Sequence, residues 1–60
     1  MGSILEVRQD GEIIAVGREL VTQKSGVIGT VVRIDETRFE GMYRVQLLVD
    51  GVERWTTYQF

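Results

Sequence analysis

The chain has 60 residues, of which 43% are hydrophobic and 27% are charged, and its net charge is −2. A chain this short buries only about 60% of its unfolded surface, so residues 1–60 are expected to form a single domain. Neither Cys nor His is present, which excludes disulfides within the chain, Cys/His zinc sites, thiolate nucleophiles and imidazole bases.

Charge and hydropathy narrow the remaining classes. The net negative charge opposes a general electrostatic attraction to nucleic acid. No stretch approaches the roughly 20 apolar residues of a membrane span, and Met1-Gly2-Ser3 lacks the basic and apolar regions of a secretory signal. We therefore expect a cytoplasmic protein without a cofactor or a bound metal.

The first predicted element is a hairpin around Asp10-Gly11. Asp and Gly both tolerate positive φ, and the dipeptide stands between two apolar-rich runs. A two-residue turn here places Val7 opposite Ile14 on one face of the hairpin. The predicted strands cover residues 4–9 and 12–17.

Between this hairpin and the last one, the pattern predicts two further extended segments and a loop. Residues 18–24 contain Leu20 and Val21 and favour a short strand over one helical turn. Residues 27–34 are rich in β-branched side chains, which is typical of a strand. Residues 35–41 have no alternating pattern and are predicted to form a surface loop.

A second hairpin is predicted around Asp50-Gly51, with strands at 43–49 and 52–57. A two-residue turn would set Arg54 opposite Leu47 and bury an unpaired charge. We therefore expect a three-residue loop in which Gly51 is the left-handed bulge residue. This register places Trp55 opposite Val45 in the core and turns Arg54 outward.

These elements predict an all-β domain, a five-stranded, strongly bent antiparallel SH3-like barrel. Curling is the economical way for so small a sheet to bury both of its faces. Residues 1–3 are expected to be a disordered or added terminus outside the barrel. Because a domain of this size without disulfides or a metal has little stability to spare, we expect a homo-oligomer.

The spacing of glycines and valines resembles known small barrels. The run from Gly17 to Gly26, the sequence Gly-Thr-Val-Val at 29–32 and the closing hairpin resemble SH3-like barrels of the KOW and Tudor kind. Within that group, Lys24-Ser25-Gly26 and Glu-Gly-x-Tyr-x-Val at 40–45 are similar to the plasmid-encoded type II dihydrofolate reductases, which are tetramers with a shared central pore.

The reductase resemblance implies an enzyme that needs neither His nor Cys. It implies that Lys24 contacts NADPH and folate, and that the pore motif Val-Gln-Ile-Tyr lies in the closing strand. Residues 54–58 read Arg-Trp-Thr-Thr-Tyr in this chain, so Tyr58 matches the motif and the glutamine is missing. The departure falls on the motif that carries the reductase function.

Two groups of side chains are candidate contact residues. In the predicted registers, Arg33, Arg44 and Arg54 face outward on three neighbouring strands, as a solvated face or as an anion-binding stripe with Arg38 and Lys24 at its margin. Trp55 and Tyr43 are predicted to be core residues, whereas aromatics in the loop and near the chain end are open to partners. The predicted binding residues are Arg33, Arg38, Phe39, Arg44, Arg54, Tyr58 and Phe60.

Three functions are compatible with these residues. The leading hypothesis is a small non-enzymatic protein-interaction module that binds a partner protein or its own copies through aromatic and edge-strand surface. The first alternative is binding of nucleic acid or ribonucleoprotein through the arginine stripe. The second is NADPH-dependent reduction of dihydrofolate. No catalytic, cofactor-binding or metal-ligating residue is predicted from the residues themselves.

Overall fold

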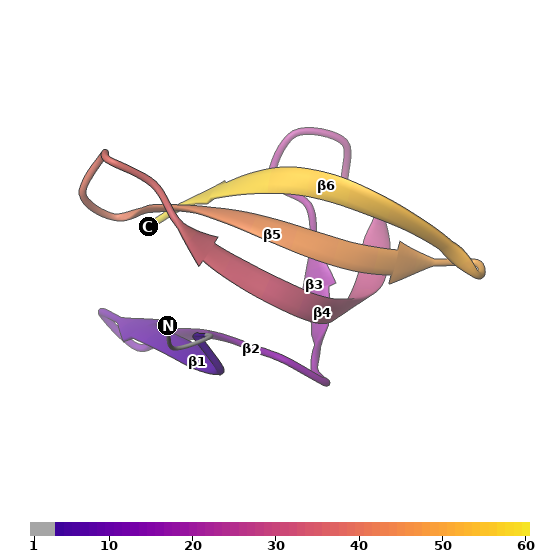
Figure 1. The fold of residues 1–60 in the computed structure, drawn as a ribbon, viewed down its shortest axis with the longest axis horizontal. Coiled ribbons are helices and arrows are strands. Elements are labelled where there is room, and N and C mark those ends of the chain that lie inside the picture. Colours follow the sequence, from indigo (N-terminus) through magenta and orange to yellow (C-terminus); the bar gives the residue numbers. More distant parts are fainter. Residues whose placement is uncertain (1–3) are drawn as a thin grey trace.

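The computed structural model describes residues 4–60 and contains six strands in two antiparallel sheets (Figure 1). Strands β1 and β2 form a two-stranded sheet, and the other four form a larger sheet in the order β3-β4-β5-β6. Residues 1–3, expected to be a terminus outside the domain, lie outside the described residues. The strands are β1 Glu6–Gln9, β2 Glu12–Ala15, β3 Glu19–Val21, β4 Ile28–Glu36, β5 Met42–Val49 and β6 Val52–Gln59.

The all-β prediction is confirmed, but the strands are arranged differently from the predicted five-stranded sheet. Six strands are divided between two sheets, which do not close into a barrel over residues 4–60. The division falls at Gly17, whose φ of 91° is left-handed. Arg18 donates its backbone N–H to the Ala15 carbonyl over 3.1 Å, so the chain turns and leaves one sheet for the other.

The register predicted for the first hairpin is confirmed. Asp10 and Gly11 have φ values of 52° and 82°, as a type I′ turn requires, and Val7 pairs with Ile14. The strands are shorter than predicted, although the Val16 N–H still donates to the Leu5 carbonyl over 3.0 Å.

The register predicted for the second hairpin is wrong. Asp50 and Gly51 have φ values of 51° and 79°, so the turn has two residues and no bulge. Arg54 consequently pairs with Leu47, and Trp55 pairs with Gln46. The charge is not buried there, because β6 is the outermost strand of the sheet and Arg54 remains exposed.

The bulge of this sheet lies in β4 instead. Its pairing with β5 shifts between Val31 and Arg33, which leaves Val32 as the extra residue. Ile4 forms a bridge with Ile34 beyond this point. β4 also extends into the predicted loop, which is closed by Thr37: its hydroxyl donates to the Met42 carbonyl over 2.8 Å.

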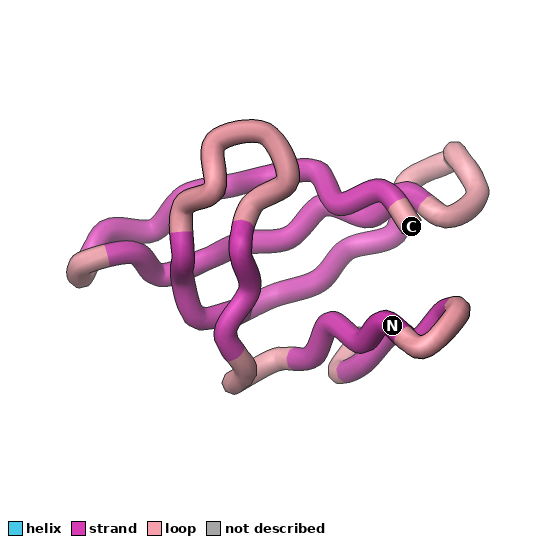
Figure 2. The backbone as a smooth tube through the Cα atoms, turned by 180° about the vertical axis from the view of Figure 1, so that it is seen from behind, coloured by secondary structure: helices cyan, strands magenta, loops and turns pink. Residues whose placement is uncertain are grey.

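The β1-β2 hairpin faces one side of the larger sheet (Figures 1 and 2), and the core cluster joins Ile14 of the hairpin to residues of that sheet. We call this side the inner face; it carries Val45 and Leu47, and the opposite, outer face carries Arg44 and Gln46. Among residues 4–60, no helix is long and apolar enough to cross a membrane. The buried hydrophobic residues are Ile14, Ala15, Leu20, Val31, Ile34, Val45, Leu47 and Tyr58.

Candidate protein-binding surface

Trp55 lies on the outer face of the larger sheet and is 44% exposed, although it was predicted to be a core residue. The guanidinium carbon of Arg44 is 4.9 Å from the centre of a Trp55 ring, within the range of a cation–π contact. Arg44 pairs with Thr57, two residues along β6, so this contact is the diagonal one that antiparallel pairing allows. The arginine thus contacts the ring, and the tryptophan remains partly exposed to solvent.

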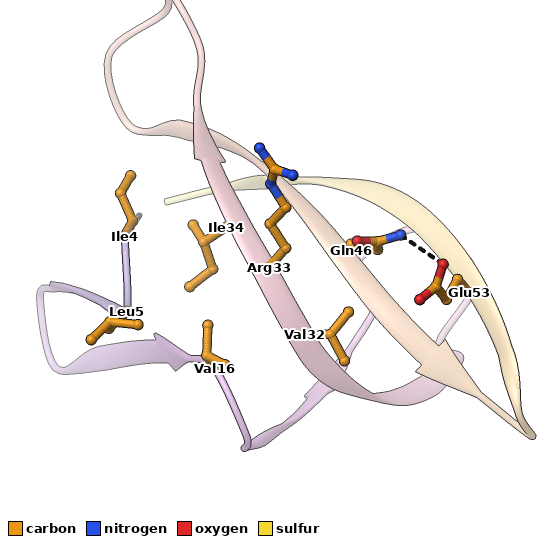
Figure 3. A pocket seen from close by; sticks show the side chains of 8 residues that line it. All are labelled: Ile4, Leu5, Val16, Val32, Arg33, Ile34, Gln46 and Glu53. Atoms are coloured by element: carbon orange, nitrogen blue, oxygen red, sulfur yellow. Dashed lines mark hydrogen bonds between the residues drawn. The ribbon is translucent and has the colours of Figure 1, made fainter. Parts of the chain in front are cut away.

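Two polar side chains next to Trp55 are also tied to each other. The Gln46 side-chain amide donates to the Glu53 carboxylate over 3.2 Å, across the β5-β6 ladder (Figure 3). On the neighbouring strand, Arg33 Nε donates to Asp35 Oδ1 over 3.0 Å. The outer face therefore places positive and negative groups around one large aromatic side chain, and of these residue types tryptophan and arginine are enriched in protein interfaces.

An open groove of about 490 Å³ begins beside this surface and runs to Ile4 and Leu5 (Figure 3). One side of it is apolar, and Leu5 there is 69% exposed. The other side is polar and includes the Gln46–Glu53 pair. The lining residues are Ile4, Leu5, Val16, Val32, Arg33, Ile34, Gln46 and Glu53.

Within residues 4–60, the backbone of β6 has a free edge, because β6 is the last strand in the order of the larger sheet. In a two-residue hairpin the residues that flank the turn, here Val49 and Val52, form a hydrogen-bonded pair, and such pairs recur at every second residue. The residues between them point their N–H and C=O groups away from β5. The residues of this second kind are Glu53, Trp55, Thr57 and Gln59.

Gln59 is the one of these four whose outward backbone groups have a partner within the described chain. Gln23 Nε2 donates to the Gln59 carbonyl over 2.8 Å, and the Gln59 N–H donates to Gln23 Oε1 over 2.9 Å. Gln23 belongs to the loop after β3, which reaches over β6 (Figure 1). These two bonds also show independently that Gln59 is an outward-pointing position of β6.

The structure brings two of the three arginines of the predicted stripe together. Arg33 and Arg44 lie on the outer face, since Arg33 pairs with Gln46 and Arg44 with Asp35. Arg54 lies on the inner side, because it is next to Trp55 in the strand and alternates with it. The predicted three-arginine stripe therefore does not form on one face.

The predicted aromatic contact residues fall into two environments. Phe39 is 60% exposed in the loop between β4 and β5, with the Arg38 guanidinium 5.7 Å from the centre of its ring. Tyr58 is 9% exposed and packs edge-on against Phe60, with ring centres 4.9 Å apart. Tyr43 also packs edge-on against Phe60, with ring centres 5.9 Å apart. Tyr58 thus belongs to the core cluster, and Phe60 is partly buried and packs against it.

The pKa of the Tyr58 phenol is raised above its usual value of 10.0. Burial is the largest cause, because it disfavours the charged phenolate. The carboxylate of Glu12 raises the pKa further, by its charge and by hydrogen bonding to the neutral hydroxyl. Tyr58 is therefore a neutral core side chain at physiological pH.

Sequence reasoning missed three residues of this surface: Trp55, Gln23 and Glu53. For Trp55, the Asp-Gly dipeptide allowed the two-residue turn that places the side chain on the outer face, but the dipeptide did not exclude the bulged turn. No feature of the neighbouring sequence identifies Gln23 as a contact residue, since its partner is 36 residues away.

Comparison of the chain with protein-family models, with curated proteins and with solved structures gave no match.

Proposed function

We propose that this chain is a small non-enzymatic protein-interaction module, which binds another polypeptide through the free edge of β6 and the adjoining surface around Trp55. The polypeptide is a partner protein or a second copy of the chain. The observation that carries the proposal is the free edge itself. Three successive outward positions, Glu53, Trp55 and Thr57, offer N–H and C=O groups to an added strand.

The side chains at the same positions support this mode of binding. Trp55 is already held in place by Arg44, so little conformational freedom is lost when a partner covers it. Trp55 is 44% exposed, so a partner that covers it buries additional apolar area. Truncation of a tryptophan is among the changes that weaken binding at an interface most. Strand addition supplies affinity through the backbone, and Trp55 supplies a side-chain anchor.

We also propose that the fold is related to an SH3-like barrel. Three features support it: the bulge at Val32, the bridge between Ile4 and Ile34, and the packing of the β1-β2 hairpin on the inner face. A bulge increases the local bend of a strand, as the curling of a small sheet requires.

The two alternative functions have weaker support. Arg33 and Arg44 share a face with Asp35 and Glu53, so that face has no clear excess of positive charge for a phosphate backbone. Tyr58, the residue that matches the reductase pore motif, is packed in the core of its own chain. Neither arrangement favours its alternative over strand addition.

The proposal is tested with a displayed library of random linear peptides, selected on the wild-type protein. We expect enriched peptides to bind wild type and Thr57→Val equally and to lose binding to Thr57→Pro. Proline removes the outward N–H at position 57 while leaving the β5 ladder intact, and proline is tolerated on edge strands for that reason. Valine keeps the N–H and serves as the matched control.

Two outcomes contradict the proposal. One is enrichment of peptides that bind Thr57→Pro as well as wild type, which places binding elsewhere on the domain. The other is failure to enrich any peptide together with sedimentation of wild type as a monomer, since an edge that binds neither peptides nor its own copies is not an interaction site.

A further inference from the structure

The free part of the β6 edge is bounded at both ends. Gly51, in the hairpin turn, ends it on one side. On the other side the Gln23 amide occupies the outward groups of Gln59. The outward positions left between these limits are Glu53, Trp55 and Thr57, and they are symmetric about Trp55.

We infer that the polypeptide bound at this edge is a second copy of the chain, whose β6 pairs antiparallel with the first about a two-fold axis at Trp55. The inference rests on the proposed function and names its partner. In this arrangement Trp55 pairs with the other copy's Trp55, and Glu53 pairs with the other copy's Thr57. Each such pair exchanges two hydrogen bonds, so every free backbone group of the edge finds a partner.

The side chains favour this register over the two nearest alternatives. A register centred on Arg54 sets the two copies' arginines directly opposite each other, and like charges in that position are destabilising. A register centred on Thr56 needs the outward groups of Gln59, which Gln23 already occupies. The register centred on Trp55 has neither fault, because it sets Arg54 opposite the other copy's Thr56.

The apolar side chains of the edge are also matched by this register. On the outer face the two Trp55 side chains come together across the axis. On the inner side Val52, which is 54% exposed, lies opposite the other copy's Tyr58. The outcome is a continuous sheet of eight strands in which Trp55 is covered by the other copy's Trp55 and Val52 by the other copy's Tyr58. Isologous pairing of this kind is the commonest basis of homodimers.

The experiment is analytical ultracentrifugation of wild type, Thr57→Pro and Thr57→Val between about 1 and 200 μM, the range in which weak dimers dissociate. We expect wild type and Thr57→Val to form dimers. Thr57→Pro should raise the dimer dissociation constant more than about tenfold, because one N–H is lost from each copy. Circular dichroism confirms that the proline variant is folded.

The register is tested separately by oxidation of the double variant Glu53→Cys with Thr57→Cys. The wild-type chain has no cysteine, so the only thiols present are the two introduced ones. Positions 53 and 57 are opposite each other across the axis but are about 13 Å apart within one strand, too far for a disulfide within a copy. We expect a covalent dimer, and little crosslinking of the single variant Arg54→Cys.

If Thr57→Pro fails to fold, the crosslinking of the cysteine variants still tests the dimer. Strong crosslinking of Arg54→Cys with none of the double variant overturns the register centred on Trp55. A wild-type monomer at the highest concentration that still binds selected peptides through the β6 edge overturns the inference and leaves the proposed function standing. A Thr57→Pro variant that remains dimeric overturns it as well, because the copies then meet elsewhere.

Discussion

The side-chain amide of Gln23 pairs with the backbone of Gln59 as a neighbouring strand would. It donates to the Gln59 carbonyl over 2.8 Å and accepts from the Gln59 N–H over 2.9 Å. The contact fastens the loop after β3 to the last residue of β6, next to Tyr58 in the core. One exposed side chain thereby closes the end of the sheet edge and determines which backbone groups remain free.

Gln23→Ala should destabilise the domain by about 1 kcal/mol, since two exposed hydrogen bonds each contribute at the low end of their usual range. Urea denaturation measures the loss. Hydrogen exchange should show faster exchange of the Gln59 N–H in particular. Lys24→Ala, at the next exposed position of the same loop, is the control and should leave both measurements unchanged. Unaltered exchange at Gln59 in Gln23→Ala would mean that the amide does not protect this edge.

Gly29→Ala should lower the free energy of unfolding by about 1–3 kcal/mol through overpacking. A Cβ at this position would lie 2.8 Å from Val49 Cγ2 and 3.1 Å from the Leu48 carbonyl oxygen, so side chain and backbone must both shift. Ile28→Ala is the control, because Ile28 is the preceding residue of β4 and is 58% exposed. Ile28→Ala should lower the free energy of unfolding by about 0.5 kcal/mol or less. Equal midpoints for the two variants in urea would argue against the close approach of β5 at Gly29.

Leu47→Ala should lower the free energy of unfolding by about 2–5 kcal/mol, because it leaves a cavity in the core, where Leu47 is 1% exposed. A domain of this size has only a few kcal/mol of stability, so the variant should be largely unfolded near room temperature by circular dichroism. Leu48→Ala removes the same side chain from the other face of β5, where Leu48 is 40% exposed, and should remain folded. The reverse order of stabilities would contradict the assignment of the two faces.

Stability should fall as the pH rises past 10, and Tyr58 should be responsible for part of the loss. Its pKa is raised in the folded state above the unfolded value of 10.0. The unfolded chain therefore releases the phenol proton first, which favours unfolding from that pH until the folded pKa is passed. Tyr58→Phe should remove this component in urea titrations between about pH 9 and 11. An unchanged slope in Tyr58→Phe would assign the loss to other groups.

Local sequence was sufficient to predict the structure wherever the turn and the strand register depend on neighbouring residues alone. In the first hairpin, Asp10-Gly11 accepts positive φ at both positions, and one apolar side chain in each strand, Val7 and Ile14, specified the register. The lack of helix-period apolar patterning correctly predicted strands throughout. The same information placed the β4 and β5 segments to within a few residues.

Local sequence was not sufficient to decide which side of β6 is covered. Alternation puts Trp55 and Arg54 on opposite sides of the strand in any register. The predicted bulge rested on the premise that the position opposite Leu47 must be buried. That premise failed because β6 is an edge strand, where Arg54 reaches solvent although Leu47 does not.

The candidate surface depends on the same distinction. The sequence alone determined the strand-forming segments, the positions of both Asp-Gly turns and the chemistry that a chain without Cys and His lacks. Only the tertiary structure decided that Trp55 is exposed beside Arg44 and that Gln23 ends the free edge at Gln59. The physical reason is that burial and edge pairing depend on segments far apart in the chain, here 36 residues, whereas turn and strand preferences are properties of neighbouring residues.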